Sequence, residues 1–155
     1  MTFTNAQIAD ATARGVFVDW QTGSNRLNAK AVTRVKNQGL CGSCWAFSVI
    51  AGLEGAWRVA GNELTAFSEQ FVLDCSNNYL SGCEGGSMRT LSSILVDNRL
   101  AVPMEKDYEY EAYAEATEAC NASAHGLGRV IGAYNIVASE GQSVEGAMAA
   151  YVREP

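Results

Sequence analysis

Apolar side chains dominate residues 43–59 and fall on nearly every face of a helix drawn through them. This distribution predicts a helix that is buried on most sides and forms the centre of the hydrophobic core. Its apolar members are Trp45, Ala46, Phe47, Val49, Ile50, Leu53, Trp57 and Val59. We interpret the two aromatic side chains at its start, Trp45 and Phe47, as core packing.

Two further helices are predicted from shorter patterns with clear end signals. Ser68 is a suitable N-cap, and Glu69 places a negative charge in the first turn, where the helix dipole favours it. The side chains expected to face inward from this second helix are Phe71, Val72 and Cys75. A third helix follows the Gly85-Gly86 pair and ends near Asn98. Its apolar positions at helical spacing are Met88, Leu91 and Ile94 or Leu95.

The remaining segments carry weaker patterns. Residues 21–30 form a polar loop rich in turn residues, and the acidic stretch that contains Tyr108, Tyr110 and Tyr113 is irregular. Residues 129–137 are rich in β-formers and predict a strand, and residues 144–152 predict a last helix. Residues 1–18 are interpreted as a junction or a processed segment.

Composition narrows the class of protein. The chain has 155 residues, 48% of them hydrophobic and 18% charged, which fits one globular domain of ordinary composition. Its formal charge of -6 has the wrong sign for neutralising a phosphate backbone, so we expect no nucleic acid partner. The most apolar region, residues 44–61, contains Glu54 and Arg58, so no membrane span is expected. Residues 1–18 lack the apolar run of a secretory signal, and any targeting signal is expected outside this chain.

The chain contains more cysteines than is usual for an ordinary cytosolic domain. Five cysteines are an odd number, so one thiol is left over when the other four form bridges. Fifteen arrangements satisfy this condition, and composition does not choose among them. The positions are Cys41, Cys44, Cys75, Cys83 and Cys120.

Cys44 stands where a thiol gains nucleophilic character. It opens the predicted core helix, and the unpaired backbone N–H groups and positive dipole at a helix N-terminus favour a thiolate. Acyl transfer also needs hydrogen-bond donors for the oxygen that becomes negative. The backbone N–H of Cys44 and the side-chain amide of Gln38, six residues earlier, are suitable donors. Gly39 and Gly42 are interpreted as keeping this loop narrow for the approach of a substrate backbone.

These residues form a motif with a known counterpart. The run Gln38-Gly-Leu-Cys-Gly-Ser-Cys44-Trp-Ala-Phe-Ser48 resembles the active-site sequence of the papain-like cysteine proteases. The resemblance continues at residues 18–20, which look like the mature N-terminus, and at residues 53–55, 68–70 and 82–86. Residues 108–110, Tyr-Glu-Tyr, are similar to a Tyr-Pro-Tyr pattern whose proline is replaced.

The resemblance implies an α+β fold of the papain-like type, mainly the helical left lobe with the beginning of the β-rich right lobe. The implied domains are a propeptide tail or junction at residues 1–18, the left lobe at 19–124, and the start of the right lobe at 125–155. The implied disulfide bonds are Cys41–Cys83 and Cys75–Cys120, with Cys44 as the free nucleophile and Gln38 in the oxyanion hole. Each bridge closes a loop of about 40–45 residues and contributes roughly 4 kcal/mol on the chain-entropy model.

The resemblance also implies a substrate-binding set, which comprises Gly42, Gly85, Gly86, Ser87 and Met88. Met88 has two interpretations: it lines the pocket for the second residue before the scissile bond, or it is the first core residue of the third helix. No cofactor and no metal ion are implied. The expected partners are peptide or protein substrates, and the expected state of the full-length protein is a monomer. The expected location is lysosomal, endosomal or extracellular, and the full-length protein is expected to be a zymogen.

A thiol protease also needs an imidazole to pair with the thiolate and a group that orients the ring. In this family the histidine and the asparagine follow the nucleophile by about 130 to 150 residues, which lies beyond residue 155. The single histidine, His125, lies in a loop-like segment after Cys120 and is not expected to be the base. The sequence is therefore interpreted as a fragment of an endopeptidase that is inactive alone.

Three rival functions stay open at this point. Cys41-Gly-Ser-Cys44 is also a C-x-x-C motif, as in thiol–disulfide oxidoreductases, and a Cys41–Cys44 bridge would favour that function. A zinc module would need a second close cysteine pair, and Cys75 and Cys83 are too far apart for one. A papain-like binding or storage protein without catalysis is the third. Separately, residues 121–123, Asn-Ala-Ser, form an N-glycosylation sequon whose use the sequence does not decide.

Overall fold

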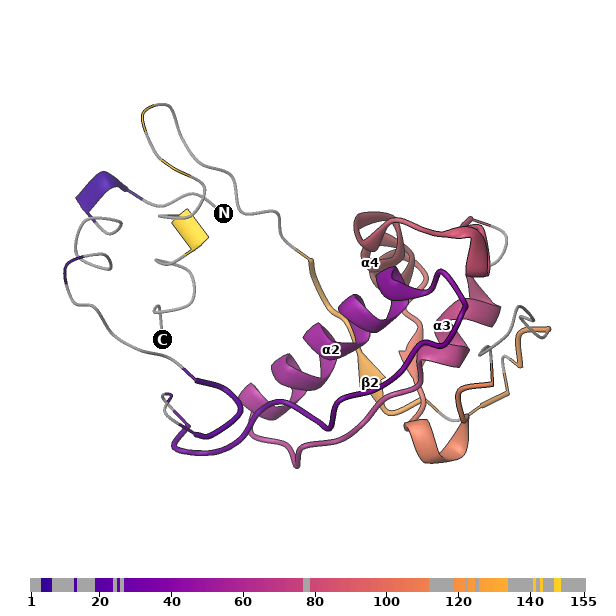
Figure 1. Cartoon of the computed structure of the whole chain (residues 1–155), viewed down its shortest axis with the longest axis horizontal. Coiled ribbons are helices and arrows are strands. Elements are labelled where there is room, and N and C mark those ends of the chain that lie inside the picture. Colours follow the sequence, from indigo (N-terminus) through magenta and orange to yellow (C-terminus); the bar gives the residue numbers. More distant parts are fainter. Residues whose placement is uncertain are drawn as a thin grey trace. The chain divides into compact units, whose positions relative to one another are not determined.

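A computed structural model gives the structure of the chain (Figure 1). It describes residues 4–6, 13, 19–23, 25, 27–76, 79–111, 119–121, 123–124, 126–133, 141, 143 and 147–148. The chain forms two compact units, one of residues 31–133 and one of residues 1–30 together with 134–155. The first three predicted helices, the cysteine bridges and the candidate site belong to the unit of residues 31–133, and the helix predicted for residues 144–152 belongs to the other unit.

The longest described helix is α2, Cys44–Val59, and it confirms the predicted core helix. Ser43 is its N-cap, although the Ser43 side chain accepts no hydrogen bond from the first turn. Trp45, Ile50 and Leu53 are buried as predicted. The prediction of burial on most sides is too strong, because one face carries small side chains that are exposed. These exposed residues are Ser48, Ala51, Gly52 and Ala56.

The two shorter helices also form where they are predicted. Helix α3, Glu69–Cys75, begins after Ser68, whose Oγ accepts a hydrogen bond from the Phe71 N–H at 2.9 Å. Helix α4, Met88–Asp97, begins after Ser87, whose Oγ accepts from the Thr90 N–H at 3.3 Å, and it ends at Asn98. Each N-cap satisfies a backbone donor that the helix itself leaves unpaired.

The described β structure is smaller than the sequence predicts. Strand β2 is Gly128–Arg129, and it pairs antiparallel with β1, Ala101–Val102, which the sequence did not predict. The strand predicted for residues 129–137 is wrong for residues 130–133, which have no regular structure. A strand needs a partner for its backbone groups. In the antiparallel register that sets Ala101 opposite Arg129, residues 130–133 would have to pair with residues 97–100, which form the end of α4 and the turn after it. Two short 3₁₀ helices complete this unit: η1, Gly82–Glu84, and η2, Glu105–Asp107.

The core is formed where α2 packs against α3 and α4. Phe67, which lies between α2 and α3 in the sequence, is fully buried and meets Trp57 edge to face, with 5.7 Å between ring centroids. Phe71 of α3 meets Tyr108 in the same geometry at 5.7 Å. The other fully or nearly fully buried apolar side chains include Ala46, Val72, Leu73, Leu91, Leu95 and Val102.

The other unit contains the polar loop predicted for residues 21–30, and its described residues form turns. Asp19 organises them: its carboxylate accepts hydrogen bonds from the Gln21 N–H at 2.7 Å and the Thr22 hydroxyl at 2.6 Å. These bonds, with that from Thr22 the largest cause, lower the pKa of Asp19. Tyr113, residues 134–137 of the predicted strand and most of the predicted helix 144–152 lie outside the described residues, although residues 147–148 are helical. The predicted domain boundaries stay predictions.

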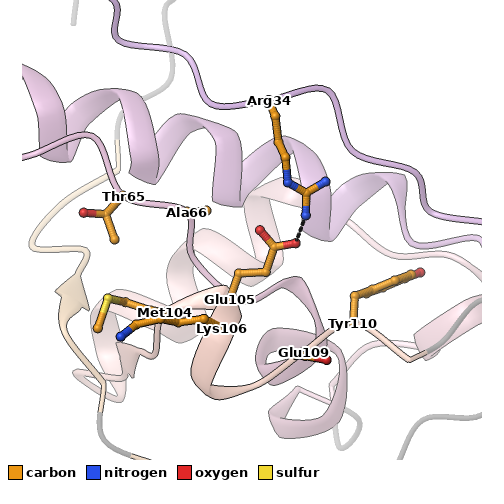
Figure 2. A pocket seen from close by; sticks show the side chains of 8 residues that line it. All are labelled: Arg34, Thr65, Ala66, Met104, Glu105, Lys106, Glu109 and Tyr110. Atoms are coloured by element: carbon orange, nitrogen blue, oxygen red, sulfur yellow. Dashed lines mark hydrogen bonds and ion pairs between the residues drawn. The ribbon is translucent and has the colours of Figure 1, made fainter.

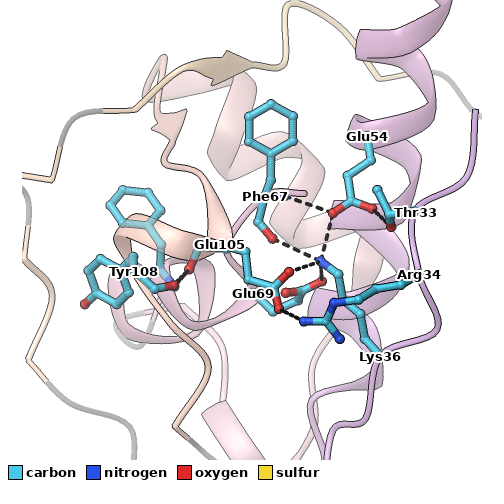
Figure 3. A network of polar contacts seen from close by, with 10 residues as sticks. Thr33, Arg34, Lys36, Glu54, Phe67, Glu69, Glu105 and Tyr108 are labelled. Atoms are coloured by element: carbon cyan, nitrogen blue, oxygen red, sulfur yellow. Dashed lines mark hydrogen bonds and ion pairs between the residues drawn. The ribbon is translucent and has the colours of Figure 1, made fainter. Parts of the chain in front are cut away.

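In the unit of residues 31–133, a buried network of ion pairs is centred on Lys36 (Figure 3). The Lys36 ammonium lies 2.8 Å from Glu54 of α2 and 2.7 Å from Glu69 of α3, and Glu105 of η2 lies 3.6 Å away. Glu54 also accepts hydrogen bonds from the Thr33 hydroxyl at 2.5 Å and the Phe67 N–H at 2.9 Å. One ammonium therefore joins the extended segment before α2 to α2, α3 and η2.

Removing the central ammonium should be costly, because it leaves carboxylates buried without their counter-charge. We predict that Lys36→Met lowers the free energy of unfolding at neutral pH by about 3–5 kcal/mol. Urea unfolding followed by tryptophan fluorescence measures the change. Lys106→Met is the matched control: its side chain is 72% exposed, and its pair with Asp107 spans 3.9 Å. The control should change stability by less than about 0.5 kcal/mol. Equal effects of the two substitutions would contradict the network's role.

Glu69 is the least well compensated carboxylate of the network. Burial raises its pKa above the ordinary value of 4.5, and the hydrogen bond and attraction from Lys36 reduce that rise without cancelling it. Among the described residues, its buried Oε2 has no hydrogen-bond partner. For Lys36, burial lowers the pKa, but the bonds and attraction from Glu54 and Glu69 outweigh burial and raise it above 10.5.

These shifts set the sign of a pH dependence. Because the pKa of Glu69 is higher in the folded state, the folded protein binds the Glu69 proton more tightly than the unfolded chain does. The stability gained from this proton is present below pH 4.5 and is lost as the pH rises through the pKa of Glu69 in the folded state. We predict that the stability of the natural chain relative to Glu69→Gln falls as the pH increases from 4.5 toward neutrality. Urea unfolding of both proteins across this range measures the difference. Parallel stability curves would contradict the assignment.

Candidate active site

The cysteine pairing leaves one thiol available. Disulfide bonds join Cys41 to Cys83 and Cys75 to Cys120, the pairing that the sequence resemblance implies. Cys44 is free, exposed, and the first residue of α2. Because Cys41 is bonded to Cys83, the Cys41–Cys44 pair that a C-x-x-C oxidoreductase needs is absent.

Gly42 brings two chain segments into close contact directly before Cys44. Its N–H donates to the Cys83 carbonyl oxygen at 2.7 Å, beside the Cys41–Cys83 bridge. A Cβ atom on Gly42 would lie 2.2 Å from that same oxygen. Only glycine allows this approach, because the obstructing atom belongs to the backbone and is held by the bridge. The structure thus gives Gly42 a packing role in addition to the predicted role of keeping the loop narrow for substrate.

A second set of contacts fixes Gln38. The Gln38 side-chain Nε2 donates to the Cys41 backbone carbonyl at 2.8 Å, and the Gln38 backbone carbonyl accepts a hydrogen bond from the Tyr110 hydroxyl at 2.9 Å. The same Tyr110 oxygen lies 2.8 Å from Oγ of the fully buried Ser43. Since a phenol has one proton to donate, Ser43 is the donor in that bond. Tyr110 therefore ties together the residues that precede Cys44 and those around Gln38.

The predicted substrate-binding segment lies beside the start of α2. The Trp45 indole N–H donates to the Gly82 carbonyl at 3.2 Å, and Gly86 packs on the same indole, where a Cβ atom would lie 2.6 Å from the ring. Ser87 caps α4, and Met88 is 54% exposed. The interpretation of Met88 as a core residue of the third helix is therefore wrong, because the apolar stripe of α4 begins at Leu91.

Two of the residues that organise this site were not singled out in the sequence. The sequence indicates Ser43 only as the start of the predicted helix, and Tyr110 only as part of an irregular acidic stretch and of the Tyr-Glu-Tyr run. The edge-to-face contact of Tyr110 with Phe47, with ring centroids 5.0 Å apart, explains how a tyrosine 67 residues after Ser43 reaches it. The sequence signal that could have pointed to Tyr110 is the weak similarity of residues 108–110 to the Tyr-Pro-Tyr pattern.

A cavity of about 540 Å³ lies in the same unit (Figure 2). The Arg34 guanidinium and the Glu105 carboxylate form an ion pair at 2.5 Å in its lining. Its lining consists of Arg34, Thr65, Ala66, Met104, Glu105, Lys106, Glu109 and Tyr110. Neither Cys44 nor Gln38 contributes to this lining, and Tyr110 is the one residue of the site around the free thiol that does.

Within the described part of the chain, no three histidine, cysteine or acidic side chains are placed to hold a metal ion. In the same residues, no helix combines the length and apolar character that crossing a membrane requires. The chemistry available at the site is that of an exposed thiol at a helix N-terminus, preceded by a loop on which the Gln38 carboxamide is fixed by the Cys41 carbonyl.

The sequence of the chain matches the family model described as papain family cysteine protease over residues 16–154. The chain belongs to the papain family of cysteine proteases. Cysteine proteinase A of Leishmania mexicana is 38% identical over 119 residues, which is 76% of this chain and 32% of that protein. A cysteine proteinase of Trypanosoma brucei brucei is 38% identical over 138 residues, 88% of this chain and 28% of that protein. The chain thus spans about a third of the length of these relatives.

Solved structures show the same papain-like fold. The bromelain protease from Ananas comosus, in complex with the E64 inhibitor, matches with a TM-score of 0.62 and 34% identity. The match covers 74% of this chain and 48% of the bromelain chain. Digestive procathepsin L 3 of the Tenebrio molitor larval midgut matches with a TM-score of 0.66 and 34% identity, over 79% and 38% of the two chains. The α+β, papain-like fold class predicted from the sequence is confirmed.

The Gly42 contact yields a direct test of how this papain-family site is built. We predict that Gly42→Ala strongly destabilises the fold and lowers the fraction of chains with an intact Cys41–Cys83 bridge, because the new methyl group meets backbone. Thermal unfolding and disulfide mapping by mass spectrometry measure both effects.

Gly52→Ala is the matched control. Gly52 lies on the exposed face of α2, and a Cβ atom there meets nothing within 4 Å. The control should raise stability by about 0.5–1 kcal/mol, the gain expected for alanine over glycine inside a helix. A Gly42→Ala protein as stable as this control, with the bridge intact, would contradict the role given to Gly42.

Proposed function

We propose that the protein containing this chain is a cysteine endopeptidase in which Cys44 is the nucleophile. The observation that carries the proposal is the position of Cys44. It is a free, exposed thiol at the N-terminus of α2, directly after a loop held by Cys83 and Tyr110. A helix N-terminus is a place where proteins stabilise negative charge, such as that of an oxyanion, and the first turn of α2 contains no acidic residue that would oppose it.

In the proposed reaction, the Cys44 thiolate attacks the carbonyl carbon of a peptide bond, and the carbonyl oxygen becomes a tetrahedral oxyanion. The intermediate collapses to a thioester as the C–N bond breaks, and the leaving amine takes a proton from an imidazolium. Water then attacks the thioester, which releases the carboxylic acid and restores the thiol.

Gln38 and the backbone N–H of Cys44 are the proposed donors to the oxyanion. One N–H of the Gln38 amide is used by the Cys41 carbonyl, which fixes the carboxamide and leaves its second N–H for the substrate oxygen. Gly42, Gly85, Gly86, Ser87 and Met88 are the proposed substrate-binding residues. The exposed Met88 side chain favours an apolar substrate residue at the second position before the cut.

The proposed mechanism needs an imidazole and a group that orients it. The match to bromelain covers 48% of that chain, and we place the imidazole in the part of the family fold that this chain does not cover. His125, which lies outside the described residues, is not proposed as the base. The 155-residue chain by itself is accordingly proposed to bind but not to turn over peptides.

The compartment and the form in which the protein is made are also proposals. Two disulfide bonds fit a route through the secretory pathway, and we propose a lysosomal, endosomal or extracellular location. We also propose that the protein is made as a zymogen and that its mature form is a monomer.

The test uses the complete protein, with the whole family fold, and a fluorogenic peptide. We predict that Cys44→Ser abolishes turnover and covalent labelling by the epoxide E64. Gln38→Ala should lower kcat by about 10²–10³, the usual cost of one oxyanion donor. Gln21→Ala, in the exposed turn of the other unit, is the matched control and should leave kcat unchanged.

Two results would contradict the proposal. One is E64 labelling at a residue other than Cys44, mapped by mass spectrometry. The other is a folded complete protein that neither reacts with E64 nor cleaves peptides, which would assign it to papain-like proteins without catalysis.

A further inference from the structure

The sequence contains one N-glycosylation sequon, and the proposed peptidase function does not use it. Asn121, Ala122 and Ser123 satisfy the pattern Asn-x-Ser with a residue other than proline at the centre. None of the other asparagines in the 155 residues is followed by serine or threonine two positions later. The motif directly follows Cys120, which is bonded to Cys75 of α3.

The structure places this sequon where a modifying enzyme has access to it. Asn121 and Ser123 are both exposed, and neither belongs to a helix or strand. A glycan is bulky and hydrophilic, so the folded protein must leave open space at the modified residue. Asn121 is exposed and so meets this condition among the residues that the structure describes.

Two hydrogen bonds join Asn121 to the described residues that follow it. The Ser123 N–H donates to Oδ1 of Asn121 at 3.1 Å, and the Ala124 N–H donates to the Asn121 carbonyl oxygen at 3.1 Å. Both bonds use oxygen atoms of Asn121, and its side-chain Nδ2, the atom that a glycan would join, is a partner in neither. Asn121 and Ser123, the two residues that define the sequon, are therefore exposed and joined by a hydrogen bond.

The surroundings also favour a surface that stays in contact with water. Asn121 lies at a hollow of about 380 Å³ whose wall includes Asp107, Glu109 and Glu111. Carboxylates accept hydrogen bonds from sugar hydroxyls and are costly to bury against an apolar partner. Neither Cys44 nor Gln38 lines this hollow, so a glycan here is compatible with an open active site.

We propose that Asn121 is an N-glycosylation site, modified in the compartment where the disulfide bonds form. The co-substrate is a lipid-pyrophosphate-linked oligosaccharide. Nδ2 of Asn121 bonds to the anomeric carbon of the first sugar while the bond from that carbon to the pyrophosphate oxygen breaks. Nδ2 loses one proton to a base of the transferase, and the lipid pyrophosphate leaves. The Cys75–Cys120 bridge next to the sequon indicates the oxidising compartment in which this reaction occurs.

The experiment expresses the 155-residue chain behind a cleavable secretory signal in yeast or mammalian cells. The chain is recovered from both the endoplasmic reticulum and the medium, so that a retained protein is still measured. Peptides containing residue 121 are analysed by mass spectrometry before and after enzymatic deglycosylation, which converts a modified asparagine to aspartate. We predict that most recovered chains carry one glycan, at Asn121.

Matched variants separate the sequon from general effects on expression. Ser123→Ala and Asn121→Gln should abolish the glycan, and Ser123→Thr, which preserves the sequon, should retain it. Asn98→Gln changes an exposed asparagine outside any sequon and should leave the glycan in place. Recovery of chains from the endoplasmic reticulum with unmodified Asn121 and an intact Cys75–Cys120 bridge would overturn the proposal. This result does not bear on the peptidase function, which is tested at Cys44.

Discussion

The position of the Cys44 thiol depends on the two bonds that join Cys83 to residues 41–42, directly before α2. Within two residues this segment is bonded to Cys83 twice, through the Cys41 disulfide and through the hydrogen bond from the Gly42 N–H. The second bond requires an approach so close that no side chain fits at Gly42. Covalent and steric constraints thus coincide at one point, two residues before Cys44. The helix then begins immediately, so its N-terminal backbone groups are presented at the thiol.

Further contacts of Lys36 and Tyr110 support this arrangement. Lys36 lies on the extended segment that leads to Gln38, and its ammonium holds Glu54 of α2 and Glu69 of α3. A buried charge network is a poor source of stability in itself, because desolvation offsets much of the attraction. The role of this network is geometric, because its contacts fix the position of the segment around Lys36 relative to α2 and α3. Tyr110 adds a neutral contact of the same kind by bonding to both Gln38 and Ser43.

The helices and the nucleophile were predictable because their signals are local. Ser68, Ser87 and Asn98 stand at the ends of apolar patterns and cap or terminate the helices they flank. Gln38 and Cys44 lie within one short motif. The remaining features depend on contacts between distant parts of the chain. The pairing of β1 with β2 joins residues about 27 positions apart, and nothing in either segment alone specifies it. The sequence shows Lys36 and Glu54 as ordinary charged residues, and their burial follows only from the packing of α2 and α3.

The most direct test of the central claim uses the 155-residue chain itself, with both disulfide bonds intact. The rate of Cys44 alkylation by iodoacetamide at neutral pH is measured by mass spectrometry for the native chain and for the chain unfolded in urea. If the start of α2 presents an accessible thiol to the positive end of the helix, Cys44 should react faster in the native state. A rate that is equal or slower in the native state would contradict the claim that the fold activates this cysteine.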